Sequence, residues 1–272
     1  MSRIAETLDR LRREGQHGLI PFITAGDPDL QTTRDLLVEL SRAGASVIEL
    51  GVPFSDPVAD GPVIQRASMR ALRKGFGVSE ILEAVRDVRE KMNVPIVLFS
   101  YLNPLLHFGI EKLGKEARRA GVDGLLVTDL SPNESETAQD LATVLKENDL
   151  DRILLVAPTS TDQRLRMIAE RASGFIYAVS RTGVTGERAE VSAEAAKLVA
   201  RLRAVTDLPV AVGFGISTRD QVSEVWRFAD AAVVGSAIVA EIEKLAGAAN
   251  LVQLIGKFTK DLLPSQVKSS TV

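Results

Sequence analysis

The sequence predicts a single α/β domain, a (β/α)8 TIM barrel with an extra helix at its N-terminus. Three observations lead to this fold class. Short apolar runs typical of strands alternate with amphipathic helical stretches along the 272 residues. Eight such runs give about 34 residues for each strand and its helix, close to the size of a βα unit. No stretch rich in Ser or Gly divides the chain, so we expect one domain over residues 1–272, with 264–272 as a frayed polar tail.

The predicted strands are nearly continuous in Val, Ile, Leu and Ala, as in parallel strands buried on both faces. In chain order they lie at residues 18–23, 47–50, 95–99, 124–127, 153–156, 175–179, 209–212 and 231–234. Proline opens the third and seventh runs, where its missing N–H is tolerated. Between the runs, apolar residues recur at helical spacing, for example over residues 30–43 and 79–91.

Eight βα units can form either a closed barrel or an open doubly wound sheet. An open dinucleotide-binding sheet carries the pattern G-x-G-x-x-G after its first strand. Here the first run is followed by Thr-Ala-Gly-Asp-Pro at residues 24–28, which does not match. The barrel is therefore favoured, and its chemistry is expected in the loops that follow the strands, at the C-terminal face.

Composition excludes several classes of function. Lys and Arg number 33 against 36 Asp and Glu, and the net charge of −3 gives no field that would hold nucleic acid or an anionic membrane. Aromatic residues make up 4%, too few for platforms that stack single-stranded bases. The chain has no cysteine and two histidines, His17 and His107, so we expect neither disulfides nor a metal site. A charged N-terminus and the absence of a long apolar run predict a soluble, cytoplasmic protein.

Two glycine-containing loops follow the seventh and eighth runs, where barrels frequently bind phosphate. One contains Gly213, Phe214 and Gly215, the other Gly235 and Ser236, and each opens into a predicted helix. Small residues let backbone N–H groups reach a phosphate, and the helix dipole adds positive charge. For either loop alone, a tight turn is an equally good interpretation; their joint position favours phosphate binding.

The loop after the sixth run covers residues 180–190 and is long for a connection between a strand and a helix. It is either a mobile lid over the site or a plain surface loop, and the sequence does not decide between the two.

The loop after the second run is the most informative. Glu49 ends an apolar strand, on the face it shares with Val47. If that face is the barrel interior, burial raises the pKa of Glu49 and suits it to acid–base catalysis. The alternative is an outward Glu49 paired with a helix Arg or Lys. Asp56 and Asp60 lie beside Pro or Gly, so turn formation is the default interpretation, although a second carboxylate near Glu49 allows divided roles.

Several segments together resemble the tryptophan synthase alpha chain family. They lie at residues 21–28, 49–62, 183–186, 213–217 and 235–239, and follow in order over most of residues 4–262. The element P-F-S-D-P-x-A-D-G-P at residues 53–62 is far more specific than any glycine loop. The resemblance implies a carbon–carbon lyase, which cleaves indole-3-glycerol phosphate by a retro-aldol reaction to indole and glyceraldehyde 3-phosphate, the alpha reaction of tryptophan biosynthesis.

The resemblance also implies roles for individual residues. Glu49 would protonate C3 of the indole and take the proton from the glycerol hydroxyl, while Asp60 would accept the hydrogen bond of the indole N–H. The phosphate would be held by Gly186, Gly213, Phe214, Gly215, Gly235 and Ser236. The indole pocket would be lined or supported by Phe22, Ile64, Tyr101, Asp129 and Tyr177, with Thr185 orienting Asp60 when the lid closes.

A partner is implied as well, the beta chain of an alpha2-beta2 heterotetramer. The beta chain would carry pyridoxal phosphate and receive the indole, and this chain itself would need no cofactor. Residues 52–60 and 182–190 should emerge at the same C-terminal mouth, so the partner is expected to dock there. Pro53, which we expect to be exposed, and Asp56 are the candidate contacts; the alternative is that they only shape their turn.

Two other classes of function are weighed against this interpretation. A different phosphate-binding barrel enzyme, such as a sugar-phosphate isomerase, is disfavoured by the acidic loop at residues 49–62. A non-catalytic homologue that only activates a beta chain is disfavoured because both Glu49 and Asp60 are present.

Overall fold

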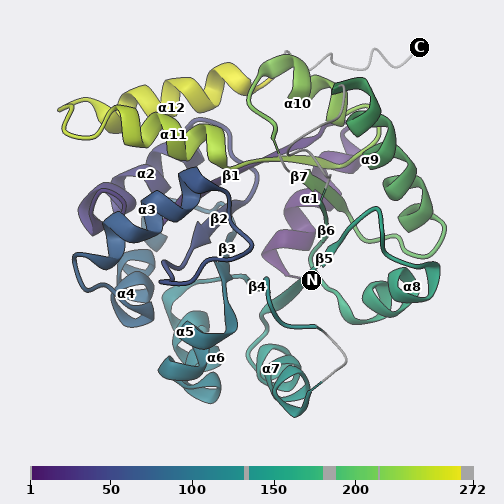
Figure 1. The fold of residues 1–272 in the computed structure, drawn as a ribbon, viewed down its shortest axis with the longest axis horizontal. Coiled ribbons are helices and arrows are strands. Elements are labelled where there is room, and N and C mark those ends of the chain that lie inside the picture. The colour runs from purple at the N-terminus through teal and green to yellow at the C-terminus, as the bar shows by residue number, and fades with distance from the viewer. Residues whose placement is uncertain (1, 132–134, 180–187, 214, 265–272) are drawn as a thin grey trace.

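The predicted barrel is confirmed in a computed structural model, which describes residues 2–131, 135–179, 188–213 and 215–264. Its strands form one closed parallel barrel in the order β1 to β8, with β1 paired to both β2 and β8. Helices surround the barrel on the outside (Figure 1). The strands are β1 (Gly18–Thr24), β2 (Ile48–Gly51), β3 (Ile96–Ser100), β4 (Gly124–Val127), β5 (Asp151–Val156), β6 (Ile176–Val179), β7 (Val210–Gly213) and β8 (Ala231–Val234).

Strand limits differ from the predicted ones by a residue or two. β3 begins at Ile96 rather than at Pro95, because proline has no N–H for the ladder and contributes only its carbonyl, which accepts from Ile48 at 2.9 Å. β5 begins two residues early, at Asp151, whose N–H donates to the carbonyl of Asp123 at 2.9 Å. A search for apolar runs misses the start of a strand when that start is a charged residue.

The helices follow the predicted alternation. Among the described residues they are α1 (Arg3–Arg13), α2 (Leu30–Arg42), α3 (Pro62–Leu72), α4 (Val78–Val88), the 3-10 turn η1 (Arg89–Lys91), α5 (Leu102–Phe108), α6 (Ile110–Ala120), α7 (Glu136–Glu147), α8 (Asp162–Arg171), α9 (Arg188–Arg203), α10 (Arg219–Val225), α11 (Ser236–Lys244) and α12 (Leu251–Leu262). The helix predicted over residues 79–91 is thus α4 followed by a 3-10 turn.

The extra N-terminal helix is confirmed and closes one end of the barrel. Ser2 caps α1 by accepting from the N–H of Ala5 at 3.2 Å. Ile4, Leu8 and Leu11 are buried and belong to the same apolar cluster as the inward side chains of the strands. Because α1 fills the end at which the strands start, the opposite, C-terminal end is left for the site.

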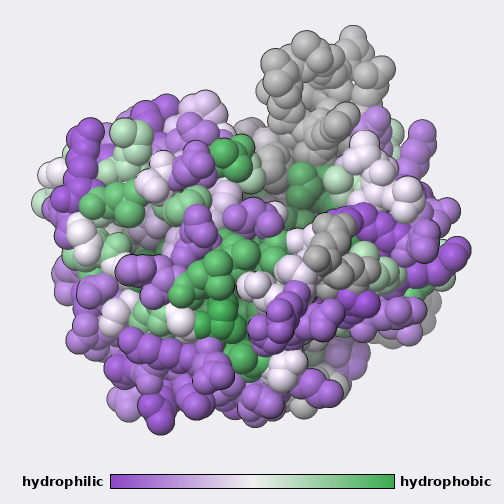
Figure 2. All heavy atoms as spheres, turned by 60° about the horizontal axis from the view of Figure 1, so that its bottom comes forward, coloured by the Kyte–Doolittle hydropathy of each residue, from purple (hydrophilic) through white to green (hydrophobic). Residues whose placement is uncertain are grey.

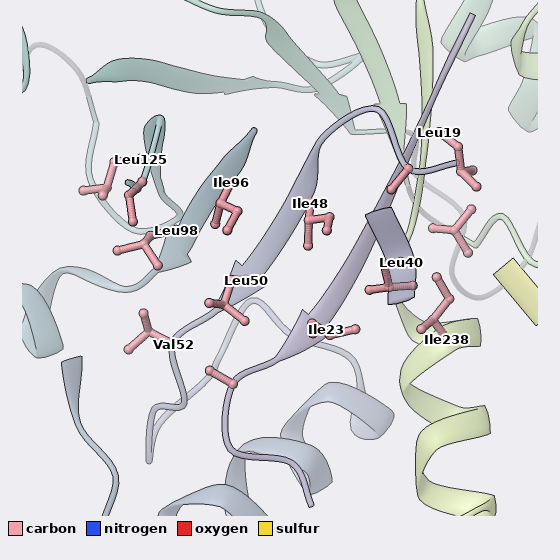
Figure 3. Close-up of a cluster of buried hydrophobic side chains, with 14 of the residues drawn as sticks. Leu19, Ile23, Leu40, Ile48, Leu50, Val52, Ile96, Leu98, Leu125 and Ile238 are labelled. Carbon is pink, nitrogen blue, oxygen red and sulfur yellow. The ribbon is translucent and has the colours of Figure 1, made fainter. Parts of the chain in front are cut away.

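Alternate residues of each strand enter two separate cores. The outward ones, such as Ile48 and Leu50 of β2, pack with helix residues including Leu40 of α2 and Ile238 of α11, as Figure 3 shows. The inward ones, such as Ile20 of β1 and Val97 of β3, form the cluster inside the barrel together with Val47, which lies one residue before β2. This parity decides which face a polar residue of a strand meets.

The surface is largely hydrophilic, with a strip of hydrophobic residues on the face drawn in Figure 2. In the part of the chain that the structure describes, each helix is too short or too polar to cross a membrane. Most of the tail predicted at residues 264–272 lies outside the described residues.

Candidate active site

Glu49 lies inside the barrel, as its shared parity with Val47 predicts. It sits on β2 between Phe22 of β1 and Val97 of β3 in the strand register. The side chain is 1% exposed, and among the described residues its Oε1 has no hydrogen-bond partner. The alternative of an outward ion pair is therefore wrong. Burial raises the pKa of Glu49 from 4.5 to about 8, so the carboxyl holds its proton at neutral pH.

Asp60 has a different environment at the edge of the same mouth. It lies in the turn before α3, where its N–H donates to the carbonyl of Pro57 at 3.0 Å. Burial raises the pKa of Asp60 to about 6, and a hydrogen bond with the Tyr101 side chain partly lowers it. Asp60 is thus mostly ionised at neutral pH while Glu49 is mostly protonated, which is the division of roles expected of a proton donor and a charge stabiliser.

Tyr101 connects the turn of Asp60 to the end of β3. Its hydroxyl accepts from the N–H of Ala59 at 2.9 Å and hydrogen-bonds to Asp60. Burial and then the charge of Asp60 raise the pKa of Tyr101. Asp129, which is exposed, accepts from the N–H of Leu102 at 2.8 Å, so it supports the start of α5 directly behind Tyr101.

Phe22 forms one wall of the mouth. It is 5% exposed and stacks edge-on against Phe99, with ring centroids 5.3 Å apart. Ile64, half-buried on α3, packs against the same apolar cluster. A Cβ on Gly51 would come within 2.4 Å of the Phe22 ring, so glycine at that position is what lets the ring lie across β2.

Tyr177, on β6, lies on the inner side of the barrel. It is buried, and burial followed by the charge of Glu49 raises its pKa well above the usual value, which places its hydroxyl in the field of Glu49. A Cβ on Gly213 would lie 2.2 Å from the Tyr177 hydroxyl oxygen. Gly213 therefore leaves the space that the Tyr177 side chain occupies.

The two glycine loops lie where the sequence predicts them. Gly213 ends β7, and Gly215 has a φ of 74°, a conformation that favours glycine. Gly235 directly follows β8 and is the N-cap of α11, whose first residue is Ser236. β7 and β8 are neighbours in the barrel, so both loops emerge side by side at its C-terminal end.

The predicted contacts of the partner interface differ in exposure. Asp56 is exposed, but the prediction of an exposed Pro53 is wrong. The chain continues beyond β2 along the barrel edge, where the N–H of Val52 donates to the carbonyl of Phe99 at 2.8 Å, and Pro53 is still buried there. It forms part of the wall of a groove of about 610 Å³ together with Phe54, Leu72, Phe76, Pro104 and Phe108.

Three predicted residues, Thr185, Gly186 and Phe214, lie outside the described residues, as does most of the loop at 180–190. Thr24 was not among the predicted site residues. It is 3% exposed, and among the described residues its hydroxyl has no hydrogen-bond partner. Its parity with Phe22 along β1, readable from the sequence, directs it to the same face. Within the described ranges no three His, Cys, Asp or Glu side chains gather as a metal site would need.

Comparisons with known proteins agree on one family. A family model described as tryptophan synthase alpha chain matches residues 8–262. The tryptophan synthase alpha chain of Citrifermentans bemidjiense is 50% identical over 270 residues, 99% of this chain and 100% of the relative. That of Solibacter usitatus is 48% identical over 262 residues, 96% of this chain and 97% of the relative.

Solved structures give the same result. Tryptophan synthase subunit alpha from Legionella pneumophila superposes with a TM-score of 0.88 at 35% identity, over 96% of this chain and 97% of that one. A chain of Mycobacterium tuberculosis tryptophan synthase superposes with a TM-score of 0.85 at 37% identity, over 97% and 99%. The chain belongs to the tryptophan synthase alpha chain family.

Proposed function

We propose that Glu49 and Asp60 carry out the alpha reaction of tryptophan biosynthesis, in which indole-3-glycerol phosphate is cleaved to indole and glyceraldehyde 3-phosphate. Membership of the family supports the reaction. The observation that carries the residue assignment is the pair of carboxyls in unlike surroundings, one with a pKa of about 8 and the other of about 6. A retro-aldol cleavage needs both a proton donor and a fixed negative charge.

Glu49 moves the proton. Its neutral carboxyl donates a proton to C3 of the indole, which makes the ring a cationic indolenine. The resulting carboxylate then takes the proton of the glycerol hydroxyl next to the scissile bond. The carbon–carbon bond breaks, its electron pair restores the aromatic indole, and the hydroxyl carbon becomes the aldehyde of glyceraldehyde 3-phosphate. Glu49 ends protonated, as it began, so one residue serves both proton transfers.

Asp60 holds the positive charge of the intermediate. An ionised carboxylate that accepts the hydrogen bond of the ring N–H stabilises the indolenine more than the neutral indole, which is the differential binding that lowers a barrier. Tyr101 supports this role, since its hydrogen bond to Asp60 favours the ionised form.

The remaining predicted residues are proposed to bind the two ends of the substrate. Phe22, Ile64 and Tyr177 offer apolar walls for the indole. The loops of Gly213 to Gly215 and of Gly235 and Ser236, with Gly186, are proposed to hold the phosphate. At the second loop the phosphate would meet the positive end of α11. Phe214 and Thr185 keep the roles that the family resemblance implies.

We further propose that the chain is one domain, works in the cytoplasm and docks on a beta chain in an alpha2-beta2 complex. Membership of the family supports a beta-chain partner, which would hold the pyridoxal phosphate while this chain uses no cofactor. Docking at the mouth would keep the apolar product from diffusing away. The groove beside Pro53 supports this surface, because it is largely apolar and adjoins the turn of exposed Asp56.

Release of indole from indole-3-glycerol phosphate tests the proposed function. We expect the purified chain to release indole alone and faster with a beta chain. A chain that activates a beta chain yet releases no indole from this substrate would be the non-catalytic homologue, and the catalytic roles of Glu49 and Asp60 would be wrong.

A further inference from the structure

Four charged side chains form one network on the outer side of the mouth. Arg70 of α3 donates through Nε and Nη2 to the two carboxylate oxygens of Asp27, both at 2.8 Å, and through Nη1 to Glu243 of α11 at 2.6 Å. Arg66, one turn earlier on α3, donates to both oxygens of Glu243 at 2.8 and 2.7 Å. We call Asp27, Arg66, Arg70 and Glu243 the clamp.

Each element joined by the clamp also carries a part of the proposed site. α3 begins at Pro62, two residues after Asp60, and α11 begins at Ser236 in the proposed phosphate loop. Asp27 lies just beyond the end of β1, which carries Phe22. The clamp therefore connects α3, which follows Asp60, with α11, which follows the proposed phosphate loop, and with the end of β1, which carries Phe22.

Beneath the clamp, the contact between α3 and α11 is apolar. Ala67 of α3, Val239 of α11 and Phe22 form one buried cluster, with Val63 and Ile64 against it. Apolar contact of this kind has no preferred direction, and it fixes the sliding or rotation of one helix on another only weakly. Paired guanidinium and carboxylate groups have a fixed planar geometry, so they can define the position that the apolar layer leaves loose.

Each carboxylate of the clamp has an arginine partner. Asp27 is 2% exposed and has its partner in the bidentate Arg70. The hydrogen bond from Arg66 lowers the pKa of Glu243 to about 2, so this carboxylate is ionised at neutral pH. Two positive and two negative groups balance, and the network needs no further ion.

We propose that the clamp, with Arg70 at its centre, positions α3 against α11, fixes the distance between Asp60 and the phosphate loop and so sets the span of the substrate site. The proposal rests on the proposed function, because it uses the assignment of the indole end to Asp60 and of the phosphate end to Gly235 and Ser236. Arg70 itself touches no substrate. Its effect is on whether both ends of one molecule can be bound in register for cleavage.

Glu243→Gln is the variant that tests the clamp most cleanly. It keeps the side-chain shape, removes the charge that links α3 to α11, and leaves the buried pair of Asp27 and Arg70 intact. The matched control is Glu241→Gln on the same helix, because Glu241 pairs only with Lys244 among the described residues, at 3.1 Å. Arg66→Gln, at a side chain 50% exposed, removes the two hydrogen bonds from Arg66 of α3 to Glu243. This variant replaces Glu243→Gln in the test if Glu243→Gln folds poorly.

Three quantities separate positioning from a structural role. They are kcat/KM for indole-3-glycerol phosphate and the inhibition constants of inorganic phosphate and of indole-3-propanol phosphate. Inorganic phosphate needs only the phosphate end of the site. Indole-3-propanol phosphate spans both ends and cannot be cleaved. We expect Glu243→Gln to lower kcat/KM about tenfold and to weaken the spanning inhibitor, with inorganic phosphate changed less than about twofold. Arg66→Gln should change the same quantities in the same direction, and Glu241→Gln should change none.

Equal kcat/KM for Glu243→Gln and Glu241→Gln, with both proteins folded by thermal unfolding, would overturn the proposal. So would an equal weakening of inorganic phosphate and of the spanning inhibitor, since that is loss of the phosphate loop and not of the span. Asp60→Asn is measured in parallel. If that variant is inactive while Glu243→Gln is fully active, only the clamp proposal fails; if Asp60→Asn is fully active, the proposed function fails.

Discussion

Replacing Glu49 by Gln should change stability with pH in a way that follows from its burial. The pKa of Glu49 in the folded protein is about 8 against an ordinary value of 4.5, so the folded protein keeps a proton that the unfolded chain has released. The contribution to stability is full below pH 4.5 and is lost as the pH rises through 8. At about 1.4 kcal/mol for each pH unit, the whole loss is about 5 kcal/mol.

Gln has the shape of the protonated carboxyl and does not titrate. Relative to the parent, Glu49→Gln should therefore gain about 3 kcal/mol of unfolding free energy between about pH 5.5 and pH 8.5. Urea unfolding at both pH values measures this difference. Glu83→Gln, at an exposed position on α4, controls for the loss of one carboxylate in general.

At neutral pH the same variant should be folded but slower in indole release by about 100-fold or more, because the proton donor is gone. An unfolding free-energy difference between Glu49→Gln and the parent that stays constant from about pH 5.5 to pH 8.5 would refute the buried, protonated state. Near-normal turnover in the folded variant would refute its role.

Further variants test the other parts of the site. Gly213→Ala should lower kcat by about tenfold with the fold retained, because the new Cβ displaces the hydroxyl of Tyr177. The control is Gly77→Ala, where a Cβ makes only an ordinary contact. Equal activities of the two variants would contradict the assignment of Tyr177 to the site. Gly235→Asp should raise KM sharply for indole-3-glycerol phosphate, because the new carboxylate repels the phosphate dianion. KM for the substrate without phosphate should change far less, because a Cβ at this position meets Phe22 only at 3.5 Å or more. Equal losses for both substrates would assign the loop to folding alone. Asp56→Ala should weaken activation by the beta chain more than basal indole release, and an equal effect on both would exclude Asp56 from the interface.

Substrate and partner should also favour each other. If the beta chain stabilises the closed mouth, linkage requires that a substrate analogue tighten beta-chain binding by the same factor. Titration of the beta chain with and without indole-3-propanol phosphate measures that factor, and identical affinities would exclude the coupling.

Much of the barrel could be predicted because each strand and helix has a local pattern of apolar residues in the sequence. The placement of Glu49 inside the barrel follows from its parity with Val47, and it needed only the fold class to be right. The two glycine loops that we propose to bind phosphate lie after β7 and β8, where the order of the strands places them. Limits were less accurate where a strand starts at a polar residue, as at Asp151.

What could not be predicted depends on residues distant in sequence. The link between Asp60 and Tyr101 exists only because the chain after β2 meets the end of β3, and the clamp needs α3, α11 and the turn after β1 to meet. The burial of Pro53 depends on how far the chain follows the barrel edge before it turns. A sequence pattern contains the residue types for each of these, but not their contacts.

The pH dependence of kcat/KM for indole release tests the central claim most directly, because that quantity reports the ionisation of the free enzyme. The claim is that Asp60 must be ionised and Glu49 protonated for the first step. With pKa values of about 6 and about 8, kcat/KM should rise through pH 6, be greatest near pH 7 and fall through pH 8. A profile that is flat from about pH 5 to pH 9, or one that keeps rising beyond pH 8, would contradict a protonated Glu49 as the proton donor.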